Sequence, residues 1–328
     1  MKKPSALVQY LNQHVIGQDA AKKTLAVAVY AHFRKIERSR QQAAQFAKSN
    51  VLLIGPTGTG KTLMCETLSQ ALEVPFVTAE ATSIAQSRYI NDEIEAIMQR
   101  LVERAGGDLA KAQNGIVFID EIDKLKASGD ETRSNSGESV QHALLKIMEG
   151  GTVKLAKGEY IDTTNVLFIC GGAFVGLEAS HSHTYGYISM SAEDNPAILE
   201  RMNARVKPTD LFRFGLIPEF TGRLPITARF QDLSKEMLVR IMTEPANSLY
   251  RQYRDIFQAE GVELTVEPAV FEQIAELAVE YKTGARSLRG LFEELITPVL
   301  YVIPDDRRIE KVLISSLFTE PRVVRRSG

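Results

Sequence analysis

The stretch from Gly55 to Thr62 limits what this chain can fold into more than any other part of the sequence. It reads G-x-x-x-x-G-K-T, follows the apolar run Val51–Ile54 and leads into a helical pattern that begins at Leu63. A glycine-rich loop of this spacing, between a strand and a helix, places its backbone N–H groups around a phosphate chain. The positive end of the helix dipole lies at the same point. We therefore expect a phosphate-binding loop on an α/β sheet.

The last two residues of the loop have separate expected roles. Lys61 would place its ammonium group against the outer phosphates, and Thr62 would put its hydroxyl on a magnesium ion. A glycine-rich turn that matches by chance fits poorly, because the strand and the helix lie where the motif requires them. The sequence thus predicts that ATP and Mg²⁺ bind at eight consecutive residues: Gly55, Pro56, Thr57, Gly58, Thr59, Gly60, Lys61 and Thr62.

A second apolar run, residues 115–119 (GIVFI), ends in the acidic residues Asp120, Glu121 and Asp123. Such a run is typical of a strand that is buried on both faces of a parallel sheet. Open α/β sheets bind ligands at the carboxyl ends of their strands. We expect Asp120 to hold the magnesium ion through water, and Glu121 to orient and polarise the attacking water. One carboxylate could simply belong to a solvated strand end, but a pair of carboxylates that follows a phosphate loop is poorly explained in that way. The sequence therefore predicts an ATPase.

Length and charge set the broad class of the protein. The chain has 328 residues, of which 44% are hydrophobic and 24% charged, the proportions of an ordinary globular protein. The chain is longer than most chains that fold around a single hydrophobic core. The shift to a helical pattern predicts an α/β domain over residues 1–230 and a smaller, mostly helical domain over 231–328. The 39 basic and 41 acidic residues argue against nucleic acid and membrane surfaces as partners.

Two cysteines and one histidine are expected in the interior of the protein, with no metal or disulfide role. Cys65 and Cys170 lie in apolar segments without further ligands at metal spacing, so we expect buried thiols. His32 is expected inside the protein, on the apolar face of a helix. No apolar run approaches the length of a membrane span, and no apolar segment follows the first lysines as in a secretion signal. A cytoplasmic location is therefore expected.

Six segments occur in order and together carry a resemblance to a known family. They are residues 15–18 (VIGQ), 55–62 (GPTGTGKT), 115–124 (GIVFIDEIDK), 167–174 (LFICGGAF), 214–225 (FGLIPEFTGRLP) and 282–289 (KTGARSLR). From about residue 7 to about residue 315, the chain resembles the ClpX-like AAA+ ATPases of the Clp/Hsp100 protein-unfoldase family. The resemblance implies an α/β P-loop large domain, a parallel sheet flanked by helices, and a smaller, mostly helical C-terminal lid domain.

The resemblance also implies roles for four residues outside the loop. Val15 and Ile16 would line the adenine pocket. Arg223 would be the finger that reaches the nucleotide of a neighbouring subunit, and Arg286 would contact the nucleotide from the lid domain. A guanidinium group offers planar, paired donors to phosphoryl oxygens. Residue chemistry alone would favour a structural arginine in both places.

Two loops of the family grip polypeptide in an axial pore. The first usually reads Gly-Tyr-Val-Gly, and the aligned residues here are Arg88, Tyr89, Ile90 and Asn91. The tyrosine and a β-branched neighbour remain, whereas both glycines are replaced, which stiffens the loop. The second loop would be residues 132–137, with Arg133 as its contact.

Three departures from the family bear on the partners. The family's N-terminal zinc-binding module is not expected in this chain, and the segment between residues 151 and 164 is shorter than the usual basic loop at the pore entrance. The family docks the ClpP peptidase through Ile-Gly-Phe, but residues 184–189 here read TYGYIS, with Tyr187 in the apolar position. A buried tyrosine hydroxyl needs a hydrogen-bond partner. We therefore expect coupling to ClpP to be weak or absent.

The leading interpretation is an ATP-driven unfoldase that assembles as a ring of six and pulls polypeptide through its pore with Tyr89. A nucleic-acid-translocating AAA+ motor is an alternative, against which the nearly neutral charge argues. A second alternative is an ATP-dependent assembly or targeting factor for one dedicated protein, which the altered pore and entrance loops leave open.

Overall fold

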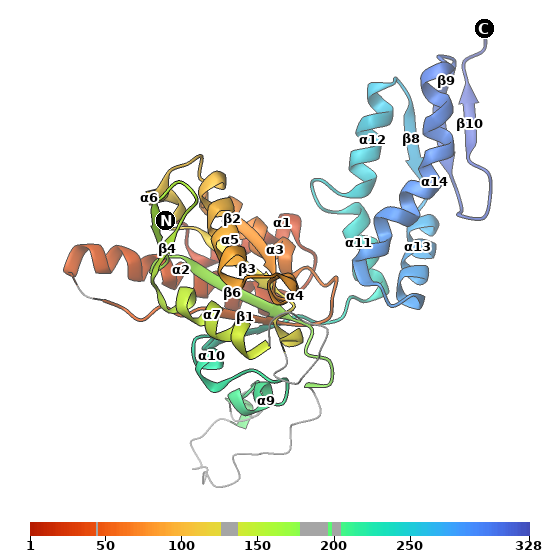
Figure 1. The fold of residues 1–328 in the computed structure, drawn as a ribbon. Coiled ribbons are helices and arrows are strands. Elements are labelled where there is room, and N and C mark those ends of the chain that lie inside the picture. The colour runs from red at the N-terminus through yellow and green to blue at the C-terminus, as the bar shows by residue number, and fades with distance from the viewer. Residues whose placement is uncertain (44, 126–136, 178–195, 199–204) are drawn as a thin grey trace.

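The computed structural model describes residues 1–43, 45–125, 137–177, 196–198 and 205–328. Its N-terminal part is built on a five-stranded sheet in the order β2-β3-β6-β1-β7, in which every neighbouring pair is parallel (Figure 1). The strands are β1 (Val51–Ile54), β2 (Phe76–Glu80), β3 (Ile116–Asp120), β6 (Leu167–Gly172) and β7 (Ile226–Arg229). The predicted α/β fold with a parallel sheet is confirmed.

The sheet separates two apolar layers. Along β1, Val51 and Leu53 belong to one core while Leu52 and Ile54 belong to the other, because successive side chains of a strand point to opposite faces. The first layer is covered by α1 (Pro4–His14), α2 (Asp19–Gln42) and α3 (Lys61–Leu72). The second is covered by α4 (Ala81–Gln86), α5 (Ile90–Arg104), α7 (Gly137–Glu149) and α10 (Pro218–Gly222). Burial on both faces explains why β1 and β3 read as unbroken apolar runs.

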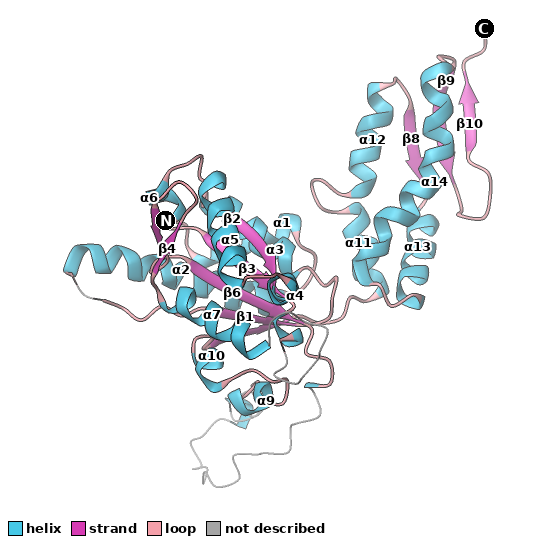
Figure 2. Cartoon of the chain, in the orientation of Figure 1, coloured by secondary structure: helices cyan, strands magenta, loops and turns pink. Residues whose placement is uncertain are grey.

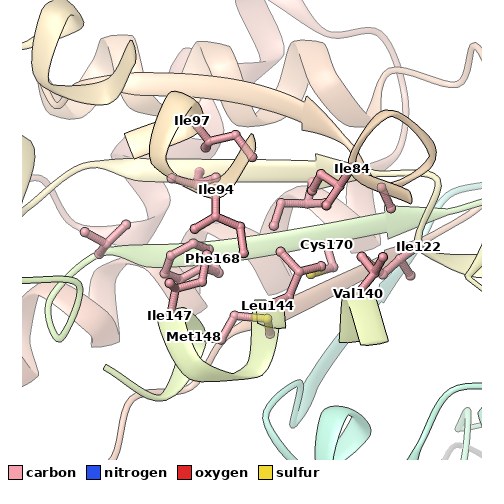
Figure 3. Close-up of a cluster of buried hydrophobic side chains, with 14 of the residues drawn as sticks. Ile84, Ile94, Ile97, Ile122, Val140, Leu144, Ile147, Met148, Phe168 and Cys170 are labelled. Atoms are coloured by element: carbon pink, nitrogen blue, oxygen red, sulfur yellow. The ribbon is translucent and has the colours of Figure 1, made fainter. Parts of the chain in front are cut away.

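The second layer shows how periodicity in the sequence becomes packing. On α5, the buried residues Ile94, Ile97, Met98 and Leu101 recur every three or four positions and so form one face of the helix. Figure 3 shows side chains of α4, α5 and α7 gathered over β6. Its labelled residues are Ile84, Ile94, Ile97, Ile122, Val140, Leu144, Ile147, Met148, Phe168 and Cys170. As expected, Cys65 and Cys170 are both free and buried, and His32 is buried as well.

Short elements complete the N-terminal part. They are α6 (Leu109–Ala112), the 3₁₀ turn η1 (Ile122–Lys124), α9 (Pro208–Phe212) and an antiparallel hairpin of β4 (Thr152–Lys154) with β5 (Tyr160–Asp162). The hairpin occupies the short segment that was expected in place of the family's basic entrance loop.

The C-terminal part has its own core. Its helices are α11 (Lys235–Thr243), α12 (Leu249–Ala259), α13 (Pro268–Glu280) and α14 (Leu288–Val302), with 3₁₀ turns η3 (Gly284–Ser287) and η4 (Ile303–Asp305). A sheet of β8 (Glu263–Val266), β9 (Ile309–Ile314) and β10 (Arg322–Arg325) lies in the order β10-β9-β8. Phe257, Phe271 and Phe292 pack in this core. Figures 1 and 2 show this mostly helical part to one side of the five-stranded sheet.

Among the described residues, no helix is both long and apolar enough to cross a membrane.

Candidate functional site

The carboxyl ends of three neighbouring strands meet at one place. Gly55 follows β1, Asp120 ends β3 and Gly172 ends β6. The Gly55 N–H donates to the Gly172 carbonyl at 3.1 Å. A Cβ on Gly55 would lie 2.6 Å from Cβ of Phe230 and 2.7 Å from its carbonyl oxygen, so the chain leaves the sheet where only glycine fits.

The loop after β1 turns directly into α3. Gly58 and Gly60 have φ values of +80° and +101°, a region that glycine enters at low cost, and Gly60 is the N-cap of α3. The first N–H groups of a helix lack partners within it and face outward from its end. In α3 they face the loop, so this end suits an anion such as a nucleotide phosphate.

Lys61 is held inside this cradle. Only 6% of the residue is exposed, and its Nζ donates to the carbonyls of Gly55 and Pro56. Burial lowers the pKa of Lys61, while the nearby charges of Asp120 and Asp123 raise it. Its ammonium group therefore lies among the loop carbonyls, close to where phosphate oxygens would be bound.

Thr62 and Asp120 line one cleft of about 380 Å³ at the same edge of the sheet. A threonine hydroxyl and a single carboxylate, completed by phosphate oxygens and water, are the donor set that Mg²⁺ takes in nucleotide sites. The residues present thus fit the ion that the loop motif predicts.

Glu121 is positioned by both oxygens of its carboxylate. The Thr82 hydroxyl donates to Oε2 at 2.6 Å, and Nζ of Lys124 donates to Oε1 at 3.1 Å. The hydrogen bond from Thr82 is the main cause that lowers the pKa of Glu121, and Lys124 lowers it further against the effect of burial. Nothing in the sequence points to Thr82, because it lies 39 residues before its partner and belongs to no motif.

The turn η3 brings Arg286 to the loop. A Cβ on Gly58 would lie 3.3 Å from the Thr283 carbonyl and 3.5 Å from Cγ of Arg286. The positive charge of Arg286 lowers the pKa values of both Lys61 and Glu121. Arg286 therefore lies beside the loop, and its contact with the nucleotide stays a prediction.

The N-terminal segment lies against the other side of the loop. Val15 and Ile16 are buried, and Cγ1 of Val15 would be 3.8 Å from a Cβ on Gly60. The side-chain amide of the neighbouring Gln18 makes two hydrogen bonds to the backbone of Gln231. Its Nε2 donates to the Gln231 carbonyl and its Oε1 accepts from the Gln231 N–H, both at 2.8 Å. The segments before β1 and after β7 are therefore joined directly.

Arg223 lies elsewhere. It follows α10, and its Nε donates to Oε1 of Glu149 at 3.1 Å. It shares a pocket of about 520 Å³ with Lys48 and Asn165, which precede β1 and β6. Arg223 is thus at the amino ends of the strands, on the sheet edge opposite the phosphate loop. The structure does not bring it to the loop of its own chain.

The predicted pore residues are only partly described. Tyr89 precedes α5 and is 57% exposed, with the Arg88 guanidinium 5.4 Å from its ring centre, and Ile90 begins the helix. Arg133, and residues 184–189 with Tyr187, lie outside the described residues.

Two family models match the chain. Residues 47–227 match the AAA domain (Cdc48 subfamily), and residues 233–313 match the C-terminal, D2-small domain of ClpB protein. The first match covers the phosphate loop and four of the five strands and ends within β7, and the second runs from α11 into β9.

Close relatives are named as Clp subunits. The chain is 43% identical to the ATP-dependent Clp protease ATP-binding subunit ClpX of Azotobacter vinelandii, over 94% of this chain and 76% of that protein. It is 40% identical to the protein of the same name from Bacteroides thetaiotaomicron, over 94% of this chain and 79% of that protein.

Proposed function

The chain belongs to the ClpX-like AAA+ ATPases, and on that premise we propose that it hydrolyses ATP to unfold or remodel other proteins. It is an ATPase of the Clp type, so the proposal concerns what the hydrolysis drives. The observation that carries it is the convergence of Lys61, Asp120, Glu121 and Arg286 on one loop. Asp120 is the last residue of β3 and Glu121 follows it, whereas Arg286 comes from the C-terminal part.

Each residue has a part in the proposed hydrolysis. Lys61 and the N–H groups at the start of α3 hold the outer phosphates. Glu121 orients the attacking water and accepts its proton. Two hydrogen bonds hold its carboxylate in place, and its lowered pKa keeps the carboxylate ionised, as a general base requires. Arg286 places positive charge where negative charge develops. Magnesium, bound through Thr62 and Asp120, would neutralise phosphate charge.

The position of Arg223 supports a ring. Because it lies on the sheet edge opposite the phosphate loop, it fits a role at the nucleotide of the next subunit, as an arginine finger. We take six subunits from the family resemblance. Tyr89, exposed at the start of α5, would contact the polypeptide substrate. Residues 1–230 and 231–328 would act as the large and lid domains, joined in part through Gln18 and Gln231.

Weak or absent coupling to a ClpP-type peptidase remains part of this proposal. It rests on the sequence of residues 184–189, which lacks Ile-Gly-Phe. Co-sedimentation with ClpP in the presence of ATP tests it, and a stable complex would contradict the proposed weak coupling.

The main test uses the Glu121→Gln variant, which keeps the shape of the side chain and removes the base. It should bind ATP and assemble, but hydrolyse ATP about 10²- to 10⁴-fold more slowly, the usual contribution of a general base. Phosphate release and nucleotide binding are measured together, with Glu37→Gln on the exposed surface of α2 as the control. Unchanged turnover in Glu121→Gln would remove this residue from the mechanism.

The same variant can identify what the motor acts on. Substrates that remain bound to Glu121→Gln with ATP would be recovered by pull-down. In the wild-type protein, unfolded polypeptide should stimulate the ATPase rate and DNA should not. Stimulation by DNA alone would contradict the unfoldase proposal.

A further inference from the structure

The outer edge of β2 is an open strand edge. In the part of the chain that the structure describes, β2 is the last strand of the large sheet and pairs with β3 alone. The Ile116 N–H donates to the Pro75 carbonyl at 2.9 Å, and the register places Phe76 opposite Ile116. In a parallel ladder of this register, the N–H and C=O groups of Phe76 and Thr78 point away from β3. Among the described residues, these outward groups have no hydrogen-bond partner.

A groove follows this edge. A hollow of about 680 Å³ is lined by residues 73–78 of the β2 segment together with residues of α3 and α5. It shares Thr62, Thr78 and Arg100 with the cleft of about 380 Å³ that reaches Asp120, so the two hollows adjoin each other. We call these two hollows together the β2 groove.

The walls of the β2 groove decide what shape of partner can enter. Open strand edges are commonly blunted by charge, proline or a covering element. Here α3 and α5 rise on the two sides of β2 and leave the backbone between them accessible. This arrangement excludes the flat edge of another sheet, but it leaves room for one extended chain to pair with β2 as an added strand.

Charge in the β2 groove favours a basic occupant. Its lining carries two guanidinium groups, Arg100 and Arg104, and six carboxylates: Glu66, Glu73, Glu80, Glu93, Glu103 and Asp120. Complementary charge selects partners and suppresses those of like charge.

We propose that the β2 groove binds an extended lysine- or arginine-rich segment of a partner protein, which adds to β2 as a sixth strand. The backbone of the segment pairs with Phe76 and Thr78, while its alternate side chains face α3 and α5 and meet their carboxylates. The far end of the segment comes close to Thr62 and Asp120, so an occupied groove is adjacent to the proposed magnesium ligands. This binding site does not depend on the proposed unfoldase activity.

A pair of synthetic peptides tests the proposal on the full chain. One is an octapeptide of alternating lysine and valine, and the other alternates glutamate and valine. The lysine peptide should bind in a salt-sensitive manner, at least about tenfold more tightly than the glutamate peptide. Fluorescence anisotropy gives both affinities. Hydrogen exchange should show new protection of the amides of Phe76 and Thr78.

The Thr78→Pro variant separates strand addition from general charge attraction. It removes an N–H that points away from β3, so the β2–β3 ladder is kept, as at the edge positions where proline is tolerated. Binding of the lysine peptide should be lost in Thr78→Pro and retained in Thr78→Val, which keeps the N–H. If Thr78→Pro does not fold, the double substitution Glu66→Lys and Glu103→Lys serves instead. It leaves the lining of the groove with no net charge, so it should abolish the preference for the lysine peptide.

Three results would overturn the proposal. The first is equal binding of the two peptides, or no binding of either. The second is full binding of the lysine peptide by a folded Thr78→Pro variant, or an unchanged preference in the double variant. The third is protection of the Phe76 and Thr78 amides when the chain assembles with ATP alone, which would assign the edge to a second copy of the chain.

Discussion

Glu121 shows how a single side chain is prepared for its proposed role. Its backbone has a φ of +61°, in the left-handed region, and its N–H donates to Oδ1 of the preceding Asp120 at 2.8 Å. Thr82 and Lys124 then fix the carboxylate from two sides. Hydrogen bonds to the charged form of a carboxyl group favour ionisation. The base is thereby kept ionised, and its direction depends on a residue at the start of α4.

Removing the Thr82 hydroxyl should change the pH dependence of hydrolysis. The bond from Thr82 lowers the pKa of Glu121, so in Thr82→Val this pKa should rise toward its ordinary value. The acidic limb of the profile of kcat against pH should therefore move to higher pH, because a base with a raised pKa is protonated earlier as pH falls. A ¹³C NMR titration of the Glu121 carboxyl group measures the same shift directly. Thr82→Ser keeps the hydroxyl, and a shift of equal size in that variant would contradict the assignment.

Lys48 is a second residue whose environment sets its charge. Its Nζ donates to the carbonyls of Thr163 at 2.9 Å and Val166 at 2.8 Å, and burial lowers its pKa to about 7. A neutral amine has two N–H groups, and the two carbonyls accept both. The folded protein can therefore hold Lys48 uncharged just above neutral pH without an unsatisfied donor.

This pKa predicts a rise of stability with pH. Between about pH 7 and pH 10, the unfolded chain carries a proton on Lys48 and the folded chain does not, so the free energy of unfolding increases with pH. The contribution of this residue approaches about 1.4 kcal/mol per pH unit. Urea unfolding at several pH values should show that Lys48→Met loses this slope, while Lys35→Met, in which Lys48 is intact, keeps it. An equal slope in Lys48→Met and wild type would contradict the lowered pKa.

At the scale of elements, the turn from β1 into the phosphate loop needs a glycine at residue 55. An added methyl group would meet the Phe230 backbone, so Gly55→Ala should lower the free energy of unfolding by about 1–3 kcal/mol. A Cβ on Gly290, inside α14, would instead point into open space, and Gly290→Ala should stabilise the helix by up to about 1 kcal/mol. Denaturant unfolding without nucleotide compares the two. Equal effects would show that the close approach at Gly55 relaxes at no cost.

The elements that could be predicted from the sequence are those whose burial is visible along the chain. β1 and β3 are buried on both faces, so their apolar runs are unbroken, and the glycines and carboxylates that follow them mark the ligand-binding edge. β10 could not be predicted this way, because this strand of arginines and valines has no buried residue. The three-residue strands β4 and β5 are too short to show a period.

The candidate site also contains residues that the sequence could identify and residues that it could not. Residues that belong to one continuous motif, such as Lys61 and Glu121, could be named from the sequence, and their roles in ATP hydrolysis stay predictions. Thr82 and Gln18 act on partners 39 and 213 residues away, so no local pattern could have identified them. Asp123 lies within a motif, but its partner could not be identified in this way, because Asp123 accepts from the N–H of Phe174, 51 residues later.

At the scale of the whole molecule, the proposed active site is shared between chains. If Lys61 acts within one chain and Arg223 acts across an interface, each single variant Lys61→Ala and Arg223→Ala should be inactive alone. When they are mixed, about a quarter of the interfaces should combine an intact Lys61 with an intact Arg223, and ATPase activity should partly return. The matched control mixes Arg223→Ala with a chain that carries both substitutions, which should restore nothing. Failure of the first mixture would leave Arg223 as a structural residue paired with Glu149.

The placement of the phosphate loop and Arg223 on opposite edges of one sheet also restricts the symmetry of any active assembly. A two-fold dimer uses one and the same patch of each subunit, so it could complete a site only if the loop and Arg223 lay within one patch, and their positions on opposite edges exclude this. Only head-to-tail contacts bring a loop against an arginine, and such contacts continue until they close into a ring or extend into a filament. Every subunit must then have the same orientation in the assembly. The order from phosphate loop to Arg223 therefore runs in one sense around the ring or along the filament, and the single chain already fixes that sense.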